Sequence, residues 1–217
     1  MHVAIAGGHG KIALLLAQIL AERDDRGLCL IRNPEHADDV REAGGEPVLC
    51  DLEHTTAAAV ADAIAGAEAV VFAAGAGPGS GEGRKWTVDF GGAALLMQAA
   101  KLAGVSRYVM VSAMGAANPP AAGGDVFGEY LRAKAAADRA LEVSGLDWTV
   151  VRPGMLTDKA PTGRVVAGPS LDRGEIPRAD VAAVVAGTIT TPGTVGVAFD
   201  LVSGPVRIDE AVAKVGR

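Results

Sequence analysis

Three side chains in the middle of the sequence have the types and the spacing to move a proton: Ser112, Tyr130 and Lys134. Tyr130 and Lys134 are four residues apart in a predicted helix, so they lie on one face of it. A phenol has a pKa of about 10 and exchanges protons poorly near neutrality, unless an adjacent cation lowers that pKa. Lys134 would supply the cation, Tyr130 would protonate a substrate oxygen, and Ser112 would hydrogen-bond the same oxygen. A surface Tyr–Lys pair, beside a serine that satisfies a backbone group, is the alternative interpretation.

The sequence opens with the pattern of a strand, a glycine turn and a helix. Val3 to Ala6 are apolar, Gly7, Gly8 and Gly10 follow, and apolar residues then recur at helical spacing from Ile12 to Leu20. In such a turn the backbone N–H groups and the positive end of the helix dipole face an anion, for example the pyrophosphate of a dinucleotide. The pattern is G-G-x-G and not a complete G-x-G-x-x-G, so a turn without a ligand is the alternative.

The tip of the second predicted strand indicates which dinucleotide would bind. The apolar run from Leu28 to Ile31 ends at Arg32 and Asn33, and Arg32 follows Gly10 by 22 positions. In a dinucleotide fold this tip lies beside the adenosine ribose, where an acidic residue binds the 2′-hydroxyl and an arginine pairs with a 2′-phosphate. The sequence therefore predicts NADP(H) in preference to NAD(H). A solvated arginine at a strand end is the alternative.

The ends of the third and fourth predicted strands carry further candidates. Asp51 and Leu52 follow the third strand, where the carboxylate could accept a hydrogen bond from the adenine amino group and the leucine could cover the ring. Asp51 could equally cap the helix predicted over residues 55–65. The fourth strand continues into a glycine-rich loop, residues 74–81, whose small residues would let the ribose and phosphates lie against the backbone.

Other candidate side chains have simpler interpretations. Asp89 could face the site from the helix predicted over residues 86–103, although a carboxylate at the start of a helix is the default interpretation. Met114, Phe127, Met155 and Leu156 could form an apolar wall around the substrate, although core packing explains them as well. The histidines are scattered without the spacing of metal ligands, so no metal site is predicted. They are His2, His9, His36 and His54.

The order of the predicted elements is that of a doubly wound parallel sheet with helices on both faces, an α/β Rossmann fold in three layers. The predicted strands are 3–6, 28–31, 47–50, 69–73, 108–112, 148–151 and 197–202. The predicted helices are 12 to about 26, 36–43, 55–65, 86–103, 126–144, 178–189 and 208–215. A glycine- and proline-containing loop is expected between residues 154 and 178, on the substrate side. We expect residues 1–217 to form one domain.

Composition limits the classes of partner. The net charge of −6 and the lack of a Lys/Arg cluster argue against a nucleic-acid surface. Cys29 and Cys50 read as buried thiols of an intracellular protein. No apolar run approaches the roughly 20 residues of a membrane helix, and the sequence opens directly with a strand in place of a signal peptide. We expect a cytoplasmic protein, monomeric or weakly dimeric, whose partner is a small-molecule substrate.

Several segments together resemble atypical, NAD(P)-binding members of the short-chain dehydrogenase/reductase superfamily, the group similar to NmrA-like and biliverdin reductase B-like flavin reductase proteins. The matching segments, which span nearly the whole chain, are residues 7–12, 32–33, 51–52, 89–92, 104–112, 134, 144–154 and 178–182. The resemblance implies that the glycine turn and the second strand tip hold the NADP phosphates, that the third strand tip meets adenine, and that the next segments flank the cofactor up to its nicotinamide end. The implied cofactor residues are Gly7, Gly8, His9, Gly10, Lys11, Ile12, Arg32, Asn33, Asp51, Leu52, Ala73, Ala74, Gly75, Val111, Ser112, Lys134, Pro153, Gly154, Met155 and Leu156.

The resemblance implies an NADP(H)-dependent oxidoreductase that reduces a small carbonyl, quinone or flavin-like acceptor. The flavin reductases of this group work without a catalytic tyrosine, and several relatives are redox sensors. A non-catalytic NADP(H)-binding regulatory protein is therefore one alternative, and an NAD(P)-dependent epimerase/dehydratase is another. Because only about 60 residues follow Pro153, we do not expect the pocket to accommodate a nucleotide sugar.

Overall fold

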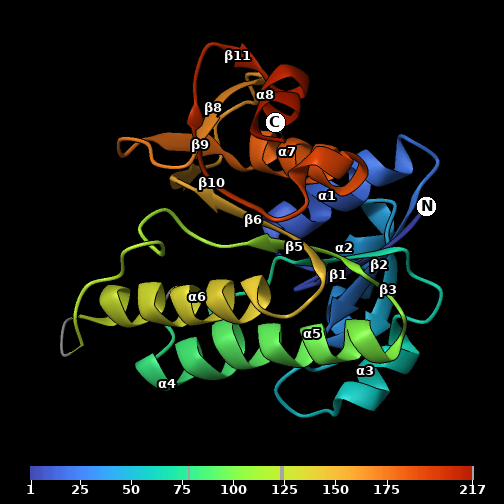
Figure 1. Cartoon of the computed structure of the whole chain (residues 1–217). Helices are drawn as coiled ribbons and strands as arrows, with labels where there is room; N and C mark the ends of the chain where they lie inside the picture. Colours follow the sequence, from blue (N-terminus) through green and yellow to red (C-terminus); the bar gives the residue numbers. More distant parts are fainter. Residues whose placement is uncertain (78, 123–124, 217) are drawn as a thin grey trace.

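The computed structural model describes residues 1–77, 79–122 and 125–216. Within these ranges the central sheet has nine strands in the order β11-β8-β10-β6-β5-β4-β1-β2-β3, and helices cover both of its faces (Figure 1). The predicted Rossmann-type α/β architecture is therefore confirmed. Pro78 of the expected glycine-rich loop, and Gly123 and Gly124 of the expected loop before the long helix, lie outside the described residues.

Seven neighbouring strands of the sheet, from β3 to β10, run parallel. In chain order the strands are β1 (His2–Ala6), β2 (Arg26–Ile31), β3 (Glu46–Leu49), β4 (Ala69–Phe72), β5 (Arg107–Val111), β6 (Asp147–Pro153), β7 (Met155–Thr157), β8 (Arg164–Gly168), β9 (Glu175–Pro177), β10 (Val197–Ser203) and β11 (Val206–Arg207). From β1 the chain adds β2 and β3 on one side and β4, β5 and β6 on the other, so the strand order changes direction between β1 and β4. Open α/β sheets bind ligands at such a switch point, at the carboxyl ends of their strands.

The helices form two layers. The α-helices are α1 (Lys11–Ala21), α2 (Ala37–Glu42), α3 (Ala57–Ala63), α4 (Glu82–Arg84), α5 (Ala93–Leu102), α6 (Val126–Glu142), α7 (Arg178–Thr190) and α8 (Ile208–Val215). In Figure 1, α1, α7 and α8 lie on one side of the sheet and α3, α5 and α6 on the other. None of the helices in the described ranges combines the length and apolar content that crossing a membrane requires.

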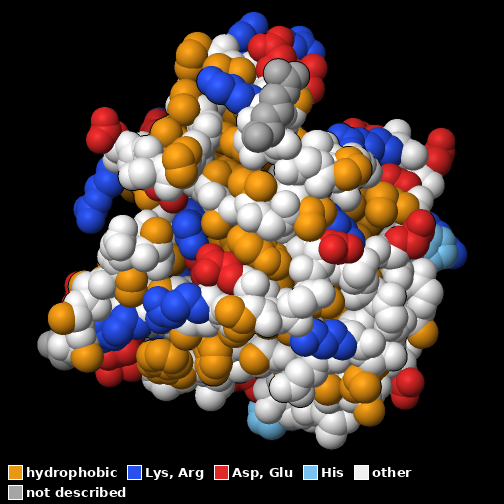
Figure 2. All heavy atoms as spheres, in the orientation of Figure 1, with side chains coloured by type: hydrophobic (Ala, Val, Ile, Leu, Met, Phe, Trp, Pro, Cys, Tyr) orange, Lys and Arg blue, Asp and Glu red, His pale blue; other side chains and the backbone are white. Residues whose placement is uncertain are grey.

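The side chains of β1 show why both layers are needed. Val3 and Ile5 belong to the apolar core under α1 and α7, whereas Ala4 and Ala6 belong to the core under α5 and α6. Successive strand residues point to opposite faces, so a strand apolar at every position must be covered twice. Figure 2 shows one outer face of the resulting molecule, with basic, acidic and apolar side chains interspersed.

The segment after β6 differs from its prediction. It contains β7 and β9, which pair in parallel as a small second sheet, and β8, which joins the edge of the main sheet antiparallel to β10. The short β11 then pairs antiparallel with β8. The expectation of a loop there was wrong. β7 and β9 have three residues each, too few to show a period-two pattern, and β8 has three consecutive apolar residues, 165–167, without alternation.

The helix predicted over residues 86–103 is irregular in its first half. Lys85 to Gly92 form a π-helix (η2), and the regular helix α5 begins only at Ala93. A π-helix has a wider hydrogen-bond ring, and such turns frequently lie at functional sites. Here the wider turn carries Asp89, which is completely buried.

Candidate functional site

The glycine turn after β1 is required by close backbone packing. Gly7 has a φ of +78°, and a Cβ on it would lie 2.6 Å from the Cα of Ala74. A Cβ on Gly8 would lie 2.6 Å from the Cβ of Cys29. Gly10 is the N-cap residue of α1 and has no side chain to accept from the first-turn amides. This end of α1 therefore offers backbone N–H donors and a partial positive charge to an anion.

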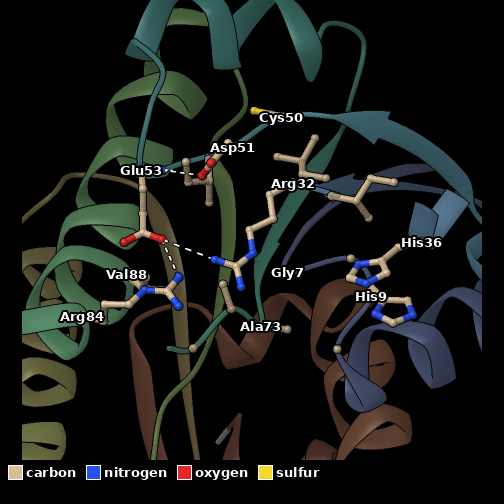
Figure 3. Close-up of a pocket in the computed structure, with 17 residues that line it drawn as sticks. Gly7, His9, Arg32, His36, Cys50, Asp51, Glu53, Ala73, Arg84 and Val88 are labelled. Atoms are coloured by element: carbon tan, nitrogen blue, oxygen red, sulfur yellow. Dashed lines mark hydrogen bonds and ion pairs between the residues drawn. The ribbon is translucent and has the colours of Figure 1, made fainter. Parts of the chain in front are cut away.

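A cavity of about 330 Å³ opens at the glycine turn, along the carboxyl ends of β1 to β4 (Figure 3). Half of the predicted cofactor residues line it, which brings together segments up to 68 positions apart in the sequence. These residues are Gly7, Gly8, His9, Gly10, Arg32, Asp51, Leu52, Ala73, Ala74 and Gly75. The cavity is also lined by Leu30, Ile31, His36, Cys50, Glu53, Arg84 and Val88, which the sequence analysis did not assign to the cofactor.

The structure excludes one of the two interpretations of Asp51. Its carboxylate accepts a hydrogen bond from the Glu53 amide at 3.0 Å and pairs with His54 at 3.0 Å. The hydrogen bond with His54 is the main reason why the pKa of Asp51 is lowered. Thr56, not Asp51, caps α3 by accepting from the Ala59 amide, so the capping alternative was wrong and Asp51 lines the cavity as an anion.

Lys134 is buried behind the cavity wall. Its ammonium donates to the carbonyl oxygens of Ala74 and Val111, each at 3.2 Å, and pairs with Asp89 at the same distance. Burial by itself lowers the pKa of Lys134, but the neighbouring Tyr130 and Asp89 outweigh that effect and raise it. Lys134 therefore stays charged, and its contact with Ala74 connects it to a residue that lines the cavity.

Asp89 was only the less favoured candidate for a side chain that faces the site. One carboxylate oxygen accepts from the Ala76 amide at 3.2 Å, and the other faces Lys134. The expectation of a helix-start carboxylate was wrong, because the π-helix turns Asp89 into the interior. The signals in the sequence were its place on the predicted helix and its membership of the segment 89–92 that carried the family resemblance.

Tyr130 lies on α6 one turn before Lys134, with the Lys134 ammonium 6.0 Å from the centre of its ring. The expectation that Lys134 lowers the pKa of Tyr130 was incomplete. Burial raises this pKa most, Lys134 opposes the rise, and Asp89 and Asp138 add to it, so the pKa lies above its ordinary value. At neutral pH Tyr130 is a protonated hydroxyl, which can donate a proton but cannot act as a base.

Ser112 follows β5 and is almost fully buried. By distance and angle its hydroxyl has no hydrogen-bond partner among the described residues, although it lies close enough to Asp138 to lower the pKa of that carboxyl. Burial raises the pKa of Asp138, against the opposing effects of Arg152, at 2.9 Å, and of Ser112. A buried hydroxyl without a partner is rare in folded proteins and is expected where a ligand or water completes the site.

The remaining predicted cofactor residues lie around the cavity and do not line it. Lys11 pairs with Asp158, Asn33 caps the short turn after β2, and Ile12 and Val111 are buried in the core. The other four follow one another at the junction of β6 and β7, beyond the strand end that carries Ser112. They are Pro153, Gly154, Met155 and Leu156.

Two further predictions on side-chain burial had different outcomes. Cys29 is fully buried, and burial raises the pKa of its thiol to about 12. Cys50 is only partly buried and lines the cavity, so the expectation of two buried thiols was wrong for Cys50. Met155 and Phe127 are exposed and not part of the core; Phe127 lies against Tyr130 with ring centres 5.9 Å apart.

The residues present fit a dinucleotide. The glycine turn offers donors for a pyrophosphate, the cavity continues past Arg32 to Asp51 and Leu52, and the unpartnered Ser112 hydroxyl and Lys134 lie at the other end. These features follow the order of a dinucleotide's parts across the carboxyl ends of the strands.

Comparison with known proteins agrees with this geometry. A family model described as NAD(P)H-binding matches residues 7–192. The chain is 37% identical over 216 residues, 99% of this chain and 100% of the other, to a Bacillus subtilis protein described as an uncharacterized sugar epimerase, YhfK. A Bacillus halodurans structure described as a candidate NAD-dependent epimerase/dehydratase superposes with a TM-score of 0.92 at 34% identity, covering 99% of both chains. The structure of the oxidoreductase ylbE from Lactococcus lactis gives a TM-score of 0.87 at 27% identity, covering 99% of this chain and 96% of that one.

The matched residues run from the glycine turn through the end of α7 and thus include the cavity and the buried Lys134. The predicted resemblance to atypical short-chain dehydrogenase/reductase proteins is confirmed. The chain belongs to the NAD(P)H-binding family, among the Rossmann-type proteins of the atypical short-chain dehydrogenase/reductase superfamily.

Proposed function

We propose that the protein is an NADP(H)-dependent oxidoreductase that reduces a small carbonyl, quinone or flavin-like acceptor. The observation that supports this most is the buried Lys134, which contacts the backbone of a cavity-lining residue and lies one helical turn from Tyr130. Burying an ammonium and a carboxylate is costly, and buried groups whose pKa is perturbed, as that of Lys134 is, are enriched at functional sites. The NADP(H) preference is supported by Arg32, whose guanidinium lies at the β2 tip in the cavity.

In this proposal the bound reduced nicotinamide supplies a hydride to the acceptor. Tyr130 donates its hydroxyl proton to the acceptor oxygen as negative charge develops there, so that a carbonyl becomes an alcohol. Lys134 stabilises the resulting phenolate, and Ser112 donates a hydrogen bond to the same oxygen. The raised pKa of Tyr130 keeps the donor protonated before the step. Tyr130 then recovers its proton from water.

NADPH oxidation with a panel of aldehydes, quinones and flavins tests the proposal. Turnover with at least one class is expected, and Tyr130→Phe should lower the rate for carbonyls far more than for flavins, whose reduction does not depend on a tyrosine. Tight NADPH binding without turnover on any acceptor would instead favour a regulatory NADP(H)-binding protein.

An epimerase is the second candidate, because the Bacillus subtilis and Bacillus halodurans relatives carry epimerase descriptions. An epimerase returns the hydride to its substrate, so the protein would retain its cofactor through purification and show no net cofactor consumption. Absorbance of the purified protein, before and after denaturation, distinguishes this outcome from a reductase that exchanges its cofactor on every turnover.

A further inference from the structure

Two arginines from different elements converge on one carboxylate at the rim of the cavity (Figure 3). Arg84 ends α4 and donates from Nη2 to Oε2 of Glu53 at 2.5 Å. Arg32, at the tip of β2, places its Nη1 3.6 Å from the same oxygen. All three side chains line the cavity. The carboxylate of Glu53 therefore lies between two guanidinium groups.

The carboxylate of Glu53 is held between the two guanidiniums as an anion. Its other oxygen, Oε1, accepts from the Thr87 hydroxyl at 2.8 Å, and the side chain is only 17% exposed. The hydrogen bond from Arg84 lowers the pKa of Glu53 most, and burial partly opposes that effect. The guanidiniums are more accessible, 40% for Arg84 and 56% for Arg32, and can present further N–H donors to the cavity.

The geometry of this cluster suits a phosphate better than a single carboxylate. A guanidinium fork binds carboxylate and phosphate oxygens in the same bidentate way. Arg32, Arg84 and Glu53 together carry a net charge of +1, and Asp51, the other carboxylate that lines this part of the cavity, is paired with His54 at 3.0 Å. Displacing Glu53 would leave both guanidiniums to a phosphate. The strand tip beside Arg32 is also the place where a dinucleotide fold positions the adenosine 2′-position.

Resting on the proposed NADP(H) function, we propose that Arg84 is a second ligand of the cofactor 2′-phosphate and that Glu53 occupies the position of this phosphate until the cofactor binds. On binding, both arginines exchange Glu53 for phosphate oxygens, which offer more acceptors and a larger negative charge. Glu53 holds the two like-charged guanidiniums together beforehand, at the cost of competing with the phosphate for them. With NADH this exchange does not occur, because the 2′-hydroxyl carries no charge.

A purely structural role for the cluster makes a different prediction. Glu53, Arg84 and Thr87 also connect the segment after β3 to the start of the π-helix. If that were their whole purpose, their replacement would change stability and would weaken both cofactors alike. The difference between NADPH and NADH therefore separates the two roles.

Binding titrations of NADPH and NADH by fluorescence, on the full chain, test the proposal. Arg84→Gln should weaken NADPH about tenfold and leave NADH unchanged, because it removes one charge-assisted bidentate contact to the phosphate. Glu53→Gln should tighten NADPH about threefold or more with NADH unchanged, because the competing carboxylate is gone. Arg26→Gln is the matched control, since it removes an exposed arginine paired with Glu46 at the opposite end of β2 and should change neither affinity.

Each result has one meaning. If Arg84→Gln leaves NADPH binding unchanged, or weakens both cofactors equally, the assignment of Arg84 is overturned while the proposed function stands. If Glu53→Gln weakens NADPH selectively, Glu53 only positions the arginines and its role as a stand-in is overturned. If the unmodified protein binds neither nucleotide, the proposed function itself fails. Thermal melts of every variant show whether it is folded.

Discussion

Asp89→Asn removes the carboxylate that lies 3.2 Å from the Lys134 ammonium and keeps the side-chain volume. The two side chains are 0% and 4% exposed, so water screens their attraction little. At an effective dielectric constant of about 20, two unit charges at this distance attract by about 5 kcal/mol. Part of that attraction offsets the cost of burial, and deleting one partner of a buried pair typically costs about 3–5 kcal/mol. Since the Asn amide oxygen still accepts a hydrogen bond, we expect the free energy of unfolding to fall by about 3 kcal/mol.

Urea unfolding of a double-mutant cycle with Lys134→Met measures this interaction. Lys134→Met alone leaves the Asp89 carboxylate buried with the Ala76 amide as its remaining partner, so it is also destabilising. The double variant carries no unpaired charge, and its loss should be smaller than the sum of the single losses by at least about 2 kcal/mol. Asp38→Asn, which breaks an exposed pair with Arg41, is the control and should have little effect.

Additivity would refute the reasoning. If the single losses sum to the double loss within about 0.5 kcal/mol, the two groups do not interact as the distance implies. The kinetics offer an independent readout, because the charge of Asp89 contributes to the raised pKa of Tyr130. Asp89→Asn should therefore shift the alkaline limb of the pH–rate profile to lower pH, whereas a purely structural Asp89 would leave that limb in place.

Three further predictions concern single groups of the site. Gly8→Ala should destabilise the protein by about 2–3 kcal/mol in denaturant unfolding and weaken NADPH binding, because the new Cβ would lie 2.6–2.8 Å from atoms of Cys29; a variant of unchanged stability would contradict the close packing. The rate of carbonyl reduction should stay level around neutral pH and fall with a midpoint above pH 10.0, since the pKa of Tyr130 is raised above that ordinary value; a decline near pH 7 to 8 would identify another group. Cys50 should react slowly with maleimide at pH 7, because burial raises the pKa of its thiol, and bound NADPH should protect it. Cys29 is fully buried and should not react in the folded protein. Equal labelling of Cys50 with and without NADPH would place it outside the cofactor site.

The sequence predicted the parts of the site that follow directly from a strand end. The glycine turn after β1 and Arg32 after β2 lie on the cavity as expected, because parallel neighbours in a doubly wound sheet bring their carboxyl ends to one edge. Asp51 after β3 joins them for the same reason. Each of these positions needs only the boundary of a predicted strand, and β1 and β2 are strongly apolar at that end.

Positions that depend on an irregular turn were not predictable in the same way. A helical pattern from residue 86 gives no sign that residues 85–92 form a π-helix, yet the wider turn is what buries Asp89. Glu53 lies just after β3, but Arg84 is 31 positions further along and follows a glycine-rich loop, so the contact between them required the tertiary structure. The short strands β7, β9 and β11 depend on pairing with neighbours and carry too few residues for a periodic signal.

The direction of the Tyr130 pKa shift could not be predicted from the sequence either. The four-residue spacing of Tyr130 and Lys134 correctly places a cation near a phenol, and that cation does lower the phenol's pKa. Spacing says nothing of burial, which acts in the opposite direction and is larger here. The carboxylates of Asp89 and Asp138 raise the pKa of Tyr130 further. Asp89 lies on the π-helix η2, and Asp138 lies two turns after Tyr130 on α6.

The two ends of the site hold their cations in different ways, and this difference predicts how the protein treats NADH. Glu53 lines the cavity and holds Arg32 and Arg84, whereas Asp89 is completely buried and holds Lys134 where no ligand can displace it. Cofactor identity therefore changes the charges at the adenosine end only. We expect NADH and NADPH to give similar kcat values and a KM at least about tenfold higher for NADH, because loss of the phosphate contacts removes binding that is equal in ground and transition states. Steady-state kinetics with both cofactors check this, and a large difference in kcat at equal KM would show that the two ends are coupled.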